Sequence, residues 1–298
     1  MTETAKYATG AALRASLEER LKHIAKTENT ELQRLRRQVA FDRFLARLFH
    51  GADTQWVLKG GYAMELRFQI ARATKDLDFT VRTAFTQGGD AMLGYLQEIG
   101  RRNLNDFFSF RVGAPMRDLD GAPYGGSRYP VEAMMAQRTF VKFHMDVGIG
   151  DVVLDPLETI RTRDWFAFAG ILPPSVPMIP REQQFAEKLH AYTLPRLGAA
   201  NTRVRDLIDM VLLIQSGTLD VSLAAESLRS TFDRRATHPI PGALEPPPTD
   251  WDSPFERLAD ECHLDRSVSK AFDELCLFYT TLSDGIHRPT ETDGISFP

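Results

Sequence analysis

The sequence has few cysteines, no long apolar run and only a small net charge. Its 298 residues include two cysteines, Cys262 and Cys276, too few for a disulfide framework or a zinc site. No apolar run approaches the length of a membrane helix, about 18 residues, and the first residues lack the apolar stretch of a signal peptide. The net charge of −4 excludes a uniformly basic nucleic-acid-binding surface but permits a local basic groove. We therefore expect a cytoplasmic globular protein without membrane contact.

The stretch 56–82 holds the most specific pattern of the chain. A short apolar run, Trp56-Val57-Leu58, stops before Gly60-Gly61, and a helical pattern follows. A glycine pair between a strand and a helix lets the backbone approach a ligand, and the N–H groups at the helix start favour phosphate. Taken alone, a double glycine indicates only a turn.

An alternating segment follows, in which Asp76 and Asp78 point to one side and Leu77 and Phe79 to the other. The strand rise places the two carboxylates about 7 Å apart on one face. Carboxylate oxygens and nucleotide phosphates are preferred ligands of Mg²⁺, so we expect Mg²⁺ (or Mn²⁺) here. The alternative for Asp-x-Asp alone is a solvated strand face.

The combination of Leu58-Lys-Gly-Gly-Tyr-Ala-Met-Glu-Leu-Arg67 with Arg72-Ala-Thr-Lys-Asp-Leu-Asp78 resembles the polymerase-β-like nucleotidyltransferase superfamily. It is most similar to the AbiEii/MenT group of toxin nucleotidyltransferases, although the Gly-Ser that opens the usual superfamily motif is Gly60-Gly61 here. The resemblance implies an α/β (α+β) fold with a mixed sheet, N-terminal helices and a helical C-terminal domain. It also implies metal-dependent transfer of a nucleotide from a nucleoside triphosphate to RNA, at the 3′ end of tRNA, and a cognate antitoxin.

A third carboxylate is expected on a neighbouring strand. Residues 136–147 alternate again, so that Lys142, His144 and Asp146 share a side, and Asp146 is the candidate; Asp151 is its rival. His144 is interpreted as a packed or solvated strand histidine. Residues 113–130 have a loop-like composition.

A second motif lies in the C-terminal part. Lys188, in Glu187-Lys188-Leu189-His190-Ala191, and the later Arg203, Asp206 and Asp209 match the AbiEii-group order. Without the resemblance, Lys188 is a solvated helix lysine and the Arg-Asp pairs are a surface salt-bridge ladder.

The resemblance assigns the site as follows. The expected metal ligands are Asp76, Asp78 and Asp146; the expected catalytic residues are these three with Lys188 and Asp209. The expected nucleotide-binding residues are Lys59, Gly60, Gly61, Lys188, Arg203 and Asp206. Two alternatives stay open: transfer to a small molecule or a protein, and a catalytically inactive nucleotide-binding module.

The remaining segments set the domain limits. Residues 10–50 are predicted as helices with a local excess of four positive charges, either a solvated face or a wall for RNA phosphates. The proline-rich stretch 172–180 is predicted as an extended linker between a nucleotidyltransferase domain, 1–172, and a helical domain, 181–298. A proline-rich loop is expected over 238–254 and a frayed tail over 284–298.

Overall fold

The computed structural model describes residues 6–51, 55–82, 88–118, 122–196 and 198–286. The chain divides into two compact units, Met1–Pro180 and Arg181–Pro298. No helix within those ranges is both long and apolar enough to cross a membrane. Of the predicted frayed tail, 284–298, residues 284–286 are helical and residues 287–298 lie outside the described residues.

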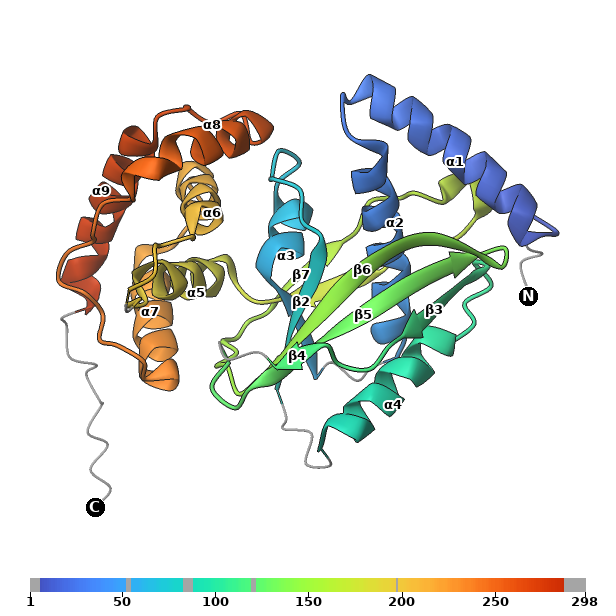
Figure 1. Ribbon diagram of the computed structural model, residues 1–298, viewed down its shortest axis with the longest axis horizontal. Coiled ribbons are helices and arrows are strands. Elements are labelled where there is room, and N and C mark those ends of the chain that lie inside the picture. The colour runs from blue at the N-terminus through green and yellow to red at the C-terminus, as the bar shows by residue number, and fades with distance from the viewer. Residues whose placement is uncertain (1–5, 52–54, 83–87, 119–121, 197, 287–298) are drawn as a thin grey trace, which may run out of the picture. The chain divides into compact units, whose positions relative to one another are not determined.

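In the residues that the structure describes, unit 1 is built around a mixed sheet of eight strands (Figure 1). The strand order is β3-β5-β6-β2-β1-β8-β7, with β4 paired to β5. The strands are β1 Trp56–Lys59, β2 Asp76–Val81, β3 Phe108–Val112, β4 Arg117–Asp118, β5 Gly126–Met135, β6 Arg138–Ile149, β7 Glu158–Arg161 and β8 Ser175–Met178. The helices are α1 Gly10–Thr27, α2 Leu32–Leu48, α3 Gly60–Arg67, α4 Gly88–Arg101 and the 3-10 helix η1 Ala167–Ala169.

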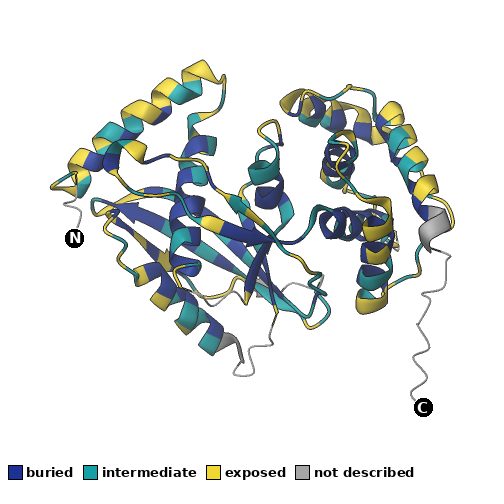
Figure 2. Ribbon diagram, turned by 180° about the vertical axis from the view of Figure 1, so that it is seen from behind, coloured by how far each residue is buried: buried dark blue, intermediate teal, exposed yellow. Residues whose placement is uncertain are grey.

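One face of the sheet is apolar because alternate strand residues point to it. Phe79 of β2 and Phe143 and Met145 of β6 form one core with apolar side chains of α1, α2 and α4. Figure 2 shows the strands of this sheet mostly in the colour of buried residues. The other face carries charged and polar side chains, and we call it the charged face. Its members, from register and exposure, are Lys59, Asp76, Asp78, Arg111, Arg128, Glu132, Lys142, His144 and Asp146.

Unit 2 consists of helices in the part that the structure describes (Figure 1). They are α5 Arg181–Thr193, α6 Val204–Gln215, α7 Val221–Arg235, η2 Thr249–Trp251, α8 Asp252–Glu261 and α9 Val268–Ile286. Phe185 and Leu189 of α5 and Leu275 of α9 are fully buried. The predicted architecture of a mixed sheet, N-terminal helices and a helical C-terminal part is therefore confirmed.

Three local predictions were wrong. The stretch 172–180 is not only a linker, because Ser175–Met178 forms strand β8, which pairs with β1 and β7. The supposed loop 113–130 contains β4 and the start of β5. The proline-rich loop 238–254 ends earlier than expected, because η2 and α8 begin within it.

Several basic residues of α1 and α2 have partners within the protein. Arg36 lies 2.6 Å from Glu18, and Arg34 lies 3.1 Å from Glu65. The almost fully buried Arg43 and Arg47 of α2 both pair with Asp106. Buried arginines are stable only with such carboxylate and carbonyl partners. These paired arginines fit neither the expected solvated face nor a wall whose cations are all available to RNA phosphates.

Candidate active site

Strand pairing brings the three predicted carboxylates together on the charged face. In the parallel pair of β2 and β6, Asp78 is opposite Asp146 and Asp76 is opposite His144. Neighbouring strands lie about 4.8 Å apart, so residues opposite each other on one face are close together. We call Asp76, Asp78 and Asp146 the carboxylate cluster. The predicted juxtaposition of Asp146 with the Asp-x-Asp pair is confirmed; the roles of the three residues stay predictions.

Asp78 is the innermost member of the cluster. Its Oδ2 accepts a hydrogen bond from the Gly61 N–H at 3.4 Å, at the start of α3. Burial, together with the negative charges of Asp146 and Asp76, raises the pKa of Asp78 to about 6. A carboxylate with two like charges beside it is a place where a cation is favoured.

Gly60 and Gly61 make room for this arrangement. Gly60 has φ +68°, and a Cβ there would stand 2.1 Å from Oδ2 of Asp78. A Cβ at Gly61 would stand 2.6 Å from Oγ1 of Thr74. The strand-to-helix turn therefore needs glycine both for its backbone and for the side chains that pack on it. Whether nucleotide also approaches here stays a prediction.

Lys59 ends β1 beside the cluster and opposite Asp78 in register. Its Nζ lies 2.5 Å from Oδ2 of Asp151, whose side chain is buried. Asp151 is thus an ion-pair partner of Lys59, while Asp146 occupies the register position next to Asp78. His144 has Nδ1 3.3 Å from Oδ1 of Asp76 and a half-exposed ring.

Arg128 of β5 is the site residue that the sequence analysis missed. It is opposite Asp146 in register, and its Nε and Nη2 donate to Oδ1 and Oδ2 of Asp146, both at 2.7 Å. Nη2 also lies 3.4 Å from Oδ2 of Asp76. The neighbouring carboxylates raise the pKa of Arg128, above all through the hydrogen bonds to Asp146. Arg128 alternates with Pro130 and Glu132, and this alternation could have identified it. The surrounding glycines and the proline obscure the pattern.

Asp76 and Asp78 are suitable ligands for a divalent metal ion. Mg²⁺ is bound by one or two carboxylates together with water and substrate phosphates, so Asp76 and Asp78 suffice as protein ligands. Among the described residues, no group of three or more Asp, Glu, His or Cys side chains is arranged to hold a metal ion. Asp146 does not complete such a group with Asp76 and Asp78, because Arg128 engages both of its oxygens.

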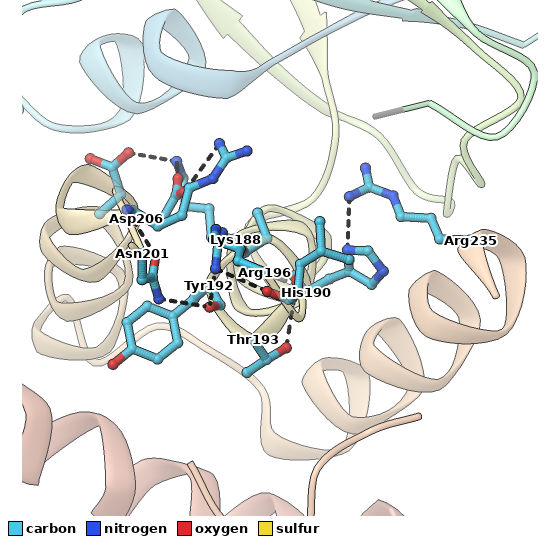
Figure 3. A network of polar contacts seen from close by, with 12 residues as sticks. Lys188, His190, Tyr192, Thr193, Arg196, Asn201, Asp206 and Arg235 are labelled. Carbon is cyan, nitrogen blue, oxygen red and sulfur yellow. Dashed lines mark hydrogen bonds and ion pairs between the residues drawn. The ribbon is translucent and has the colours of Figure 1, made fainter. Parts of the chain in front are cut away.

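The second predicted motif lies within unit 2, on α5 and α6. Lys188 Nζ lies 2.5 Å from Oδ2 of Asp209 and 3.3 Å from Oδ1 of Asp206. Arg203 Nη1 lies 3.7 Å from Oδ2 of Asp206. Lys188 is therefore not the solvated lysine of the alternative interpretation: it is buried and paired, as is Asp209. Lys188 and Asp206 belong to the polar network drawn around α5 in Figure 3.

The network around α5 continues through histidines. Nε2 of His190 lies 2.9 Å from the hydroxyl of Thr237. Its Nδ1 lies 3.4 Å from Arg235 (Figure 3). Asn201, just before α6, donates to the Tyr192 carbonyl at 3.1 Å. These contacts fix the end of α5 and the segment before α6, and so the residues around Lys188.

The fold is similar to that of a toxin nucleotidyltransferase of known structure. MenT4, a nucleotidyltransferase toxin from Mycobacterium tuberculosis, is 19% identical, with 91% of this chain and 89% of that chain covered and a TM-score of 0.55. JHP933 from Helicobacter pylori is 17% identical over 86% of this chain and 94% of that chain, with a TM-score of 0.46. No curated protein sequence matches the chain.

Residues 43–275 match the family described as nucleotidyl transferase AbiEii toxin, type IV TA system. This range contains the carboxylate cluster, Lys59 and the Lys188 motif. The chain belongs to this family of toxin nucleotidyltransferases, which is the group that the two sequence motifs predicted.

Proposed function

We propose that this protein transfers a nucleotide from a nucleoside triphosphate to the 3′ end of tRNA, using Mg²⁺ or Mn²⁺. The observation that carries the proposal is the carboxylate cluster in adjacent register on the charged face, next to a strand-to-helix turn that requires glycine. Membership of a toxin–antitoxin family supports an antitoxin partner, and cytoplasmic action is part of the proposal.

The reaction is an in-line substitution at the α-phosphorus. The acceptor oxygen forms a bond to this phosphorus while the bond to the bridging oxygen of the β-phosphate breaks, so pyrophosphate leaves and the hydroxyl proton passes to water. Asp76 and Asp78 would hold the metal ion, which when bound lowers the pKa of the hydroxyl and neutralises phosphate charge. In unit 1, Lys59 is the proposed cation for the triphosphate. In unit 2, Lys188 and Arg203 are proposed nucleotide-binding cations, and Asp206 and Asp209 are the proposed carboxylates that orient Lys188.

The test is to incubate the protein with each labelled nucleoside triphosphate, Mg²⁺ and total tRNA. We expect labelled tRNA, and we expect Asp76→Asn and Asp78→Asn each to lower the rate more than about a hundredfold, because a metal ion supplies several kcal/mol of charge stabilisation. Asp164→Asn, at an exposed position of the same unit, is the matched control.

Three outcomes would contradict the proposal in different ways. Label on a small molecule or a protein but never on RNA would support the alternative acceptors. Nucleotide binding without transfer to any acceptor would indicate an inactive nucleotide-binding protein. Full activity of the two Asp→Asn variants would remove the metal role from the carboxylate pair.

A further inference from the structure

Three charged side chains from three adjacent strands form one row on the charged face. Asp78 of β2 is opposite Asp146 of β6, which is opposite Arg128 of β5. The row therefore changes from two carboxylates to one guanidinium within two strand spacings, each about 4.8 Å. The strand register thus places the guanidinium of Arg128 beside the carboxylate cluster.

Arg128 and Asp146 form a charge-assisted, bidentate pair, which is a strong type of hydrogen-bonded contact. Two parallel hydrogen bonds of 2.7 Å join the guanidinium edge to both carboxylate oxygens, a bidentate geometry that fixes the direction of the guanidinium. The exposed fraction of the side chain is 25% for Arg128 and 14% for Asp146. Asp146 consequently has each oxygen engaged and little access to water.

The other edge of the guanidinium is not used in the same way. Within the ranges that the structure describes, Nη1 of Arg128 has no hydrogen-bond partner, while Nη2 reaches Asp76 at 3.4 Å. A guanidinium that is held on one edge by a carboxylate presents the two N–H groups of its Nη1 in a fixed direction. Those two donors match phosphate oxygens in charge and hydrogen-bonding capacity.

We propose that Arg128 binds phosphate oxygens of the nucleotide, and that Asp146 is the positioning residue that holds it. In this arrangement Arg128 engages both oxygens of Asp146, and Asp76 with Asp78 would hold a single ion. The inference rests on the proposed function, and it replaces the predicted role of Asp146 as a metal ligand.

Binding measurements test this without any transfer reaction. Mn²⁺ binding is measured by electron paramagnetic resonance, and binding of Mg²⁺-tripolyphosphate by calorimetry, on the full chain. Arg128→Gln should weaken tripolyphosphate binding roughly tenfold or more, because a hydrogen bond to a charged group is removed. Asp146→Asn should weaken tripolyphosphate binding severalfold by releasing Arg128, while Mn²⁺ affinity changes less than about threefold, since no ligand is removed.

Arg161→Gln is the matched control, because Arg161 is an exposed arginine on β7 of the same sheet. It should leave both affinities unchanged, and an equal loss there would overturn the proposal in favour of general electrostatics. The proposal also fails if Asp146→Asn lowers Mn²⁺ affinity tenfold or more and Arg128→Gln leaves tripolyphosphate binding unchanged, because Asp146 would then be a metal ligand.

A conservative variant and the activity of the wild-type protein complete the test. Arg128→Lys retains the charge without the planar guanidinium and should bind tripolyphosphate with intermediate affinity, so it serves if Arg128→Gln does not fold. Absence of nucleotide transfer in the wild-type protein would contradict the proposed function and leave these two affinities to decide the role of Arg128.

Discussion

The charge state of a single residue, Asp78, couples the stability of the protein to pH. Its carboxylate packs against the turn at Gly60 and has Asp146 and Asp76 as neighbours. Its folded-state pKa of about 6 lies above the value near 3.8 of an unperturbed Asp. The folded state therefore binds this proton more tightly than the unfolded state. Stability from this group is fully present below about pH 4 and is lost as the pH rises through about 6.

We predict that Asp78→Asn makes the metal-free protein more stable at pH 7.5 by up to about 3 kcal/mol, since about two pKa units are involved. The difference from wild type should shrink towards pH 4. Urea unfolding in the presence of a chelator measures it. Asp42, whose pKa burial raises to about 7, is present in both proteins and cancels.

Addition of Mg²⁺ should reverse the order at pH 7.5, because only the wild type gains from binding an ion through Asp78. A stability difference that does not depend on pH, with or without Mg²⁺, would show that Asp78 does not titrate in this range.

The ion pair of Lys188 and Asp209 is buried, so its variants change stability as well as activity. Both side chains are buried, so Lys188→Ala would leave a buried carboxylate without its closest cation. We predict a loss of about 3–5 kcal/mol in the free energy of unfolding for this variant. The double variant Lys188→Met, Asp209→Leu should recover most of that loss, because the buried charge is removed with its partner.

Denaturant unfolding of the two single variants and the double variant gives the coupling energy. If Lys188 also contacts the triphosphate, the double variant should be folded but inactive. A folded double variant with wild-type transfer would return Lys188 to a structural role.

At the scale of the elements, the turn from β1 to α3 is the feature that positions Asp78. Gly60 combines a positive φ of +68° with contact to that carboxylate, whereas Gly217 has φ +64° and open space where a Cβ would stand. Gly60→Ala and Gly217→Ala therefore share the backbone cost, about 1 kcal/mol, and differ in the clash.

We predict that Gly60→Ala destabilises the protein by at least about 1 kcal/mol more than Gly217→Ala, and that it alone weakens Mn²⁺ binding, because Asp78 must move. Thermal unfolding and electron paramagnetic resonance measure the two effects. Equal destabilisation with unchanged Mn²⁺ affinity in both variants would show that the turn does not position the carboxylate.

How far the sequence predicts such elements depends on how regular their pattern is. The segments of β2 and β6 alternate strictly, so their polar faces and the partnership of Asp78 with Asp146 could be predicted. Strand β5 could not be predicted, because Gly126 and Pro130 obscure its alternation. The loop-like composition of 113–130 predicts a loop around Arg128 instead. The pairing of β8 with β1 and β7 depends on residues distant in sequence, which the prolines of 172–180 do not indicate.

For the whole molecule, the distribution of charge decides where RNA can bind. The predicted basic wall before residue 50 is largely engaged in internal pairs, so replacing Arg34 or Arg36 would break the pairs with Glu65 or Glu18 and would not isolate an RNA effect. The charged face offers better candidates. Arg111 and Lys142 have exposed fractions of 72% and 73%, and they lie 3.8 Å and 3.6 Å from Glu132, too far for a tight ion pair.

We predict that Arg111→Gln combined with Lys142→Gln raises the KM for tRNA about tenfold and leaves the KM for the nucleotide unchanged. Removal of one phosphate interaction should also flatten the dependence of log binding constant on log salt by about one unit, so the pair should flatten it by about two. Lys22→Gln combined with Lys26→Gln on α1 is the matched control, because both side chains are exposed and the charge change is the same. If the α1 pair changes the salt slope and the sheet pair does not, the RNA surface lies on the helices; if neither changes it, the charged face does not bind the acceptor.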